Sequence, residues 1–172
     1  ILKNVLENDE IPAITTPYFN FFELDVLCRM GKLTEVLDKI RSYWGGMLDL
    51  GAVTFWEEYD PSVPKEEQYD MYGDHFGKSL CHAWAASPIY FLAKYFAGLD
   101  LVNKDGVTYI LKPQMQYFTE LDCTLPVGSN GVVRLVWDGE ILEITPNADG
   151  GMLELGEQKL SLVRGETRRV KI

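Results

Sequence analysis

Cysteine, histidine and positive charge are all scarce in this sequence. It holds three cysteines and two histidines, His75 and His82, and no two cysteines form a C-x-x-C pair. This scarcity excludes a zinc site and a disulfide framework, and we expect neither a metal nor a cofactor. Cys28 and Cys81 are predicted to be small buried hydrophobic side chains.

Acidic residues outnumber basic ones by 26 to 16, which gives a formal net charge of -10. Nucleic-acid binding requires a clustered Lys/Arg surface, and the one basic cluster is the short run "VRGETRRVK" at 163–171. We therefore exclude a nucleic-acid partner. The basic run is predicted to be an edge strand kept soluble by its charge.

Long apolar runs are also missing, and the chain does not start with a basic-then-apolar leader. No membrane span or membrane partner is expected. The first residues, "ILKNVLEND", begin in the middle of a pattern without a cap, so we expect residue 1 to be a cut inside a longer polypeptide.

Hydrophobic residues make up 47% of the chain, and their spacing changes from helical to strand-like along it. Thr16 and Pro17 predict the start of a helix that ends at Gly31, with apolar residues around most of its circumference. A one-sided outer helix is expected over 33–48, and a third helix over 82–98, either restarted or kinked at Pro88. The first two helices predict an antiparallel hairpin of the kind found in double-layer helical barrels.

Short alternating runs follow from residue 107, at 107–113, 131–139, 140–146, 151–156, 158–165 and 168–172. Turn sequences such as "SNG" and "NADGG" separate them, which is typical of an antiparallel sheet or sandwich. The fold class is therefore helical segments followed in series by an antiparallel β-sandwich, with domains at 1–112 and 113–172. Between the hairpin and the third helix, a loop rich in Pro, Gly, Asp and Tyr is long enough to be functional.

The stretch "GAVTFWEEYD" at 51–60 places two adjacent glutamates among aromatic residues. In an extended chain Glu57 and Glu58 would point to opposite faces, so they are not expected to act as a pair. A carboxylate among aromatic rings is partly desolvated, which would raise its pKa, and such rings also stack on sugars. The alternative is that Phe55, Trp56 and Tyr59 are core aromatics and that both glutamates are solvated.

Other candidates have equally simple structural explanations. His82 fits a satisfied buried histidine better than a catalytic one. The aromatic residues of the third helix are predicted to be helix core rather than a ligand platform: Trp84, Tyr90, Phe91, Tyr95 and Phe96. Asp70, Asp74 and His75 match no metal-binding motif.

Two motifs in order, "MLDLGAVTFWEEYDP" and "SLCHAWAASPIYFLAKYFAGL", resemble the end of the catalytic domain of bacterial α-L-rhamnosidases of glycoside hydrolase family 78. That family shows a "GATTFWE" type stretch, then a "SLCHGWSAGP" type stretch, then a C-terminal β-sandwich. The resemblance is close over residues 16–112 and general over 113–172. It implies that 1–112 is the C-terminal portion of a six-hairpin (α/α)6 barrel.

The resemblance also implies an inverting hydrolysis of terminal α-L-rhamnose, with Glu57 as the general base. Trp56 and His82 match positions near the rhamnose site, and we add Tyr59 as a substrate-binding aromatic. In an inverting enzyme the general acid lies roughly 6.5 to 9.5 Å from the base. The family's acidic, arginine-containing motif for that acid does not occur in these residues, so the isolated chain is expected to be inactive.

The expected partners are a rhamnose-containing carbohydrate and, through the exposed edge of the barrel, the remainder of the parent enzyme or a second copy of the chain. Two alternatives stay open. One is another (α/α)6 glycosidase that acts on a different sugar. The other is a non-catalytic carbohydrate-binding or scaffolding module.

Overall fold

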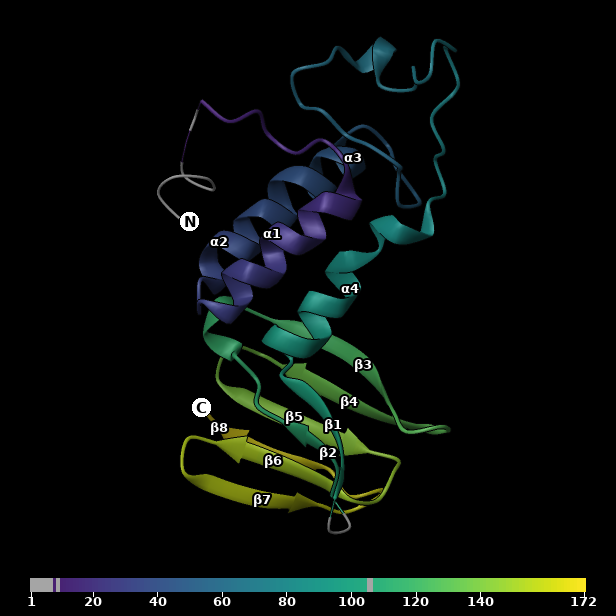
Figure 1. Cartoon of the computed structure of the whole chain (residues 1–172). Helices are drawn as coiled ribbons and strands as arrows, with labels where there is room; N and C mark the ends of the chain where they lie inside the picture. The colour runs from purple at the N-terminus through teal and green to yellow at the C-terminus, as the bar shows by residue number, and fades with distance from the viewer. Residues whose placement is uncertain (1–7, 9, 105–106) are drawn as a thin grey trace. The chain divides into compact units, whose positions relative to one another are not determined.

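The computed structural model describes residue 8, residues 10–104 and residues 107–172 (Figure 1). Its contacts divide the chain into two compact units, Ile1–Ile89 and Tyr90–Ile172. The sequence placed the division after residue 112. Strands over 99–104 and 107–111 pair within the second unit of the structure.

The first unit is built on a helical hairpin, as predicted. Helix α1 (Pro17–Arg29) starts directly after Thr16, with the proline at a position where its missing N–H costs nothing. The chain turns at Gly31, whose φ of 73° favours glycine. A second continuous helix follows, made of α2 (Leu33–Lys39), a π-helical stretch (Ile40–Trp44) and α3 (Gly45–Asp49). Figure 1 shows α1 and α2 lying side by side.

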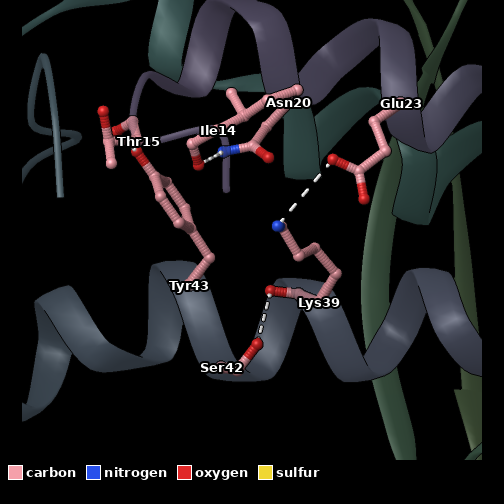
Figure 2. Close-up of polar contacts among 7 residues, drawn as sticks. All are labelled: Ile14, Thr15, Asn20, Glu23, Lys39, Ser42 and Tyr43. Carbon is pink, nitrogen blue, oxygen red and sulfur yellow. Dashed lines mark hydrogen bonds and ion pairs between the residues drawn. The ribbon is translucent and has the colours of Figure 1, made fainter. Parts of the chain in front are cut away.

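Polar contacts also join the start of α1 to the second helix (Figure 2). The Tyr43 hydroxyl donates a hydrogen bond to the carbonyl of Thr15. Nζ of Lys39 lies 3.8 Å from Oε2 of Glu23, which links the two helices. Before α1, the carbonyl of Ile14 accepts a hydrogen bond from the Asn20 side chain at 3.3 Å. The segment that leads into α1 is therefore anchored on the π-helical stretch of the second helix.

The two helices differ in how they are covered. The second helix is one-sided as predicted, with five apolar side chains buried: Val36, Leu37, Tyr43, Trp44 and Met47. Apolar residues are spread around most of helix α1, which predicted that other elements would cover it on several sides. It does bury Leu24, Leu27 and Cys28. In the described residues one of its faces is exposed, comprising Tyr18, Phe19, Phe22, Val26 and Met30.

The loop and the third helical segment complete this region. Residues 50–82 contain a single 3₁₀ turn, Lys65–Glu67, in agreement with the predicted long loop. The third segment is a 3₁₀ turn (Ala83–Ala85) followed by α4 (Ser87–Phe91) and a π-helical stretch (Leu92–Phe96). The regular helix thus begins at Ser87, one residue before Pro88, rather than at residue 82. No helix among the described residues is long and apolar enough to cross a membrane.

The second unit is a β-sandwich of two four-stranded sheets within the described residues. One sheet has the order β1 (Leu99–Lys104), β2 (Val107–Leu111), β6 (Gly151–Leu155), β7 (Gln158–Leu162). The other has the order β3 (Leu121–Val127), β4 (Gly131–Trp137), β5 (Ile141–Pro146), β8 (Arg168–Lys171). All neighbouring strands are antiparallel except β2 and β6, which run parallel.

A single core joins the two sheets of this unit. Buried side chains from β2 and β6, such as Tyr109 and Leu153, share it with Leu135 of β4 and Ile144 of β5. The predicted class, helices followed by a β-sandwich, is therefore confirmed. Strand β8 lies at the edge of its sheet, as the basic run predicted, while β1 and β3 are strands that the sequence patterns missed.

Candidate functional site

The segment around Glu57 is an irregular stretch bound side by side to the end of the long loop. The Glu57 N–H donates to the carbonyl of Ser79 at 2.9 Å, and the His82 N–H donates to the carbonyl of Phe55 at 2.8 Å. The Thr54 hydroxyl donates to the carbonyl of Leu80. These contacts bring Glu57 and His82 together although they are 25 positions apart in the sequence.

Glu57 is 8% exposed, and both of its carboxylate oxygens have donors. Oε1 accepts a hydrogen bond from the Tyr72 hydroxyl at 2.9 Å, and Oε2 accepts one from the Ser79 N–H at 3.1 Å. Oε2 also lies 3.7 Å from Nδ1 of His82. The carboxylate is therefore held in one orientation by groups from two parts of the loop.

The electrostatics of Glu57 differ from the sequence expectation. Burial does raise its pKa, but the hydrogen bonds from Ser79 and Tyr72 and the nearby side chains of His82 and Lys78 outweigh burial, so the pKa is lowered. The prediction of a raised pKa was wrong because it counted aromatic neighbours and could not see the donors. A lowered pKa keeps the group ionised at neutral pH, the form that accepts a proton.

The sequence patterns missed three residues of this site, Tyr72, Lys78 and Ser79. Lys78 is buried, and burial lowers its pKa against the opposing influence of the surrounding carboxylates. Ser79 acts through its backbone, which no residue pattern reveals. Tyr72 had one available signal, since it precedes Gly73, and glycine is common in tight turns.

Glu58 has a separate partner, because its Oε1 accepts a hydrogen bond from the Thr15 hydroxyl at 2.8 Å. The two glutamates thus have different hydrogen-bond partners, and the prediction that they do not act as a pair stays a prediction. That prediction assumed that successive side chains alternate between two faces, as in a strand. The segment is not a strand, and Tyr59 does not share the contacts of Glu57.

Trp56 and Tyr59, the predicted substrate-binding aromatics, are both buried. The Trp56 ring packs edge-on against Tyr69 at 5.7 Å, and the Tyr59 ring packs against Tyr43 at 5.6 Å. The Tyr59 N–H donates to the carbonyl of Thr15 at 3.1 Å. In these positions the two rings fix the backbone on both sides of Glu57, and their contact with a substrate stays a prediction.

Exposed aromatic rings continue from His82 across the surface of the first unit. The Trp84 ring lies 4.2 Å from His82 and 5.4 Å from Tyr18, which in turn lies 5.6 Å from Phe22. Trp84 is 51% exposed, so the prediction that it belongs to a helix core was wrong. The prediction was also wrong for the exposed Tyr90, whereas Phe91 and Phe96 are buried as expected.

Trp44 holds the turn that carries His82 and Trp84. Its Nε1 donates to the carbonyl of Ala85 at 2.8 Å, and the indole is buried. His82 lies directly before this 3₁₀ turn, so the exposed Trp84 ring packs against the imidazole that lies beside Glu57. Rings of this kind are suited to stacking on the apolar face of a sugar.

The remaining candidates contribute no chemistry to this site. Cys81 is exposed, which corrects the expectation that it is buried, whereas Cys28 is buried and burial raises its pKa to about 12. His75 pairs with Asp70 at 2.5 Å on the exposed part of the loop. No group of three or more His, Cys, Asp or Glu side chains in the described part of the chain is placed to hold a metal ion.

The fold belongs to a recognisable class, helical hairpin elements followed by a β-sandwich. No protein-family model and no curated protein matches the chain. Among solved structures, it is similar to a GH78 family rhamnosidase of Bacillus sp. GL1, with 25% sequence identity and a TM-score of 0.62. The match covers 84% of this chain and 15% of that chain. The protein therefore has a GH78-like fold and spans a small part of that rhamnosidase's length.

Proposed function

We propose that this chain is part of an inverting glycoside hydrolase that releases terminal α-L-rhamnose, with Glu57 as the general base. The observation that carries the proposal is the buried, ionised Glu57 carboxylate, held by Tyr72 and Ser79 beside His82 and the exposed ring of Trp84. The likeness to a GH78 rhamnosidase supports the same assignment.

In this mechanism the Glu57 carboxylate takes a proton from the attacking water, while a second carboxylic acid protonates the leaving oxygen. We place the general acid, and the rest of the (α/α)6 barrel, in a longer protein to which these residues belong. His82 and Trp84 would bind the sugar beside the base. The exposed side chains of α1 would contact that remainder of the protein.

Two assays on an aryl α-L-rhamnoside test the proposal. The 172-residue chain alone should give no turnover, because it supplies only the base of an acid/base pair. In the longer protein, Glu57→Gln should lower turnover at least about a hundredfold and still bind rhamnose. Wild-type turnover in that variant would remove Glu57 from the mechanism.

A second candidate function is carbohydrate binding without cleavage, favoured by the exposed rings of Tyr18, Phe22 and Trp84. Binding of rhamnosides to the chain by calorimetry would then depend on Trp84 and not on Glu57. Loss of turnover in Glu57→Gln of the longer protein would exclude this alternative.

A further inference from the structure

A tight turn in the loop carries the hydroxyl that reaches Glu57. Met71 and Asp74 exchange backbone hydrogen bonds of 3.0 and 2.9 Å, and the two residues between them have positive φ, 54° at Tyr72 and 81° at Gly73. Two central residues with positive φ define a type I′ turn, which favours Asn, Asp or Gly. A tyrosine in the first of these positions is conformationally unfavourable.

Packing of the ring does not explain a tyrosine at this place. Tyr72 is 82% exposed, so its ring gains little from burial. Among the described residues, the hydrogen-bond partner of its hydroxyl is Oε1 of Glu57. The side chain therefore combines an unfavourable backbone conformation with a single well-formed polar contact.

Backbone hydrogen bonds also hold the loop residues that follow the turn. The Phe76 N–H donates to Oδ1 of Asp74 at 3.1 Å, and the Lys78 N–H donates to the carbonyl of Tyr69 at 3.2 Å. A Cβ atom on Gly77 would lie 2.2 Å from the carbonyl oxygen of Met71, so glycine allows this close return. The chain then reaches Ser79, whose N–H binds the other oxygen of Glu57.

We propose that Tyr72 is a positioning residue for Glu57, and that the strained turn exists to aim its hydroxyl at Oε1 and fix the orientation of the carboxylate. This inference rests on the proposed role of Glu57 as general base. An ionised carboxylate has about four acceptor sites, so the donors from Tyr72 and Ser79 leave room for the attacking water. A base held in one orientation keeps that water aligned with the sugar.

The test is Tyr72→Phe, which removes only the hydroxyl of an exposed side chain. The hydroxyl stabilises the ionised form of Glu57, so its loss should raise the pKa of Glu57, measured by NMR titration of the 172-residue chain. In the longer protein, the acidic limb of the kcat/KM profile should move to higher pH by the same amount. We expect kcat to fall about tenfold with little change in KM.

Tyr69→Phe is the matched control, since it makes the same chemical change in the same loop without touching Glu57; neither the Glu57 pKa nor the pH profile should move. An unchanged Glu57 pKa in Tyr72→Phe, or a moved pKa with an unchanged pH profile, overturns the positioning role alone. If the pKa moves but Glu57→Gln retains wild-type turnover, the proposed function fails, and with it the proposal that Tyr72 positions a catalytic base.

Discussion

Replacing Glu57 by glutamine tests the site independently of any activity, through the stability of the first unit. Glutamine keeps the size of the side chain, but it has one acceptor oxygen where the carboxylate has two. The Ser79 N–H can only donate, so the amide oxygen should turn toward it. The Tyr72 hydroxyl can rotate and accept a hydrogen bond from the amide nitrogen.

The cost of the substitution follows from these contacts. In the best arrangement Glu57→Gln keeps two hydrogen bonds and loses the charge assistance of both. Hydrogen bonds to charged groups contribute about 1 kcal/mol more than neutral ones, and the bond to the exposed Tyr72 is weakened by solvent. We expect the free energy of unfolding at pH 7 to fall by about 1 to 2 kcal/mol.

The difference between the two proteins should depend on pH with a defined sign. Because the folded-state pKa of Glu57 is lowered, its contribution to stability is complete above the unfolded-state pKa and is lost as pH falls through the folded-state pKa. Urea unfolding followed by tryptophan fluorescence suits this test, since Trp44, Trp56 and Trp84 lie in the first unit. Below the folded-state pKa, wild type and Glu57→Gln should unfold at the same urea concentration.

Glu58→Gln provides the control, because its amide oxygen can still accept the hydrogen bond from Thr15 and the change should be below about 0.5 kcal/mol. Equal stability of wild type and Glu57→Gln at pH 7 would refute the hydrogen-bonded site. So would a stability difference that persists unchanged at acidic pH.

Two further predictions concern packing and reactivity. In Gly46→Ala the new Cβ would lie 2.4 Å from the hydroxyl of the buried Tyr59, so calorimetry should show a loss of about 2 kcal/mol. Gly45→Ala has no atom within 4 Å of its new Cβ, and it should leave the stability unchanged or raise it by up to about 1 kcal/mol. In the folded chain a maleimide should label the exposed Cys81 well before the buried Cys28, whose pKa of about 12 disfavours the thiolate. Mass spectrometry would identify the labelled cysteine, and equal labelling of both would contradict the structure.

Local signals were sufficient wherever neighbours in sequence decide the conformation. Thr16 and Pro17 predicted the start of α1, Gly31 its end, and the alternating runs predicted six of the strands. They failed for β1 and β3, although each of these strands pairs with the strand that directly follows it, β2 and β4. A proline argues against a strand in a sequence pattern, and β3 contains Pro126.

The features of the candidate site also fall into those that adjacent residues predict and those that they do not. The aromatic setting of Glu57 and its separation from Glu58 could be predicted, because both follow from adjacent residues. The burial of individual aromatic residues could not be predicted from a helical pattern. Trp84 has apolar neighbours in the sequence, but it is exposed in the fold. Periodicity describes one element, whereas exposure depends on which other elements cover it.

The sequence by itself determined the class of fold and the long loop, and its resemblance to a known family selected Glu57 as the leading carboxylate. The tertiary structure alone decided that carboxylate's state. Its pKa is lowered because a loop brings the Tyr72 hydroxyl and the Ser79 N–H from 15 and 22 positions away onto its two oxygens. The physical reason is that hydrogen bonds act through distance and direction in space, which the order of residues does not specify.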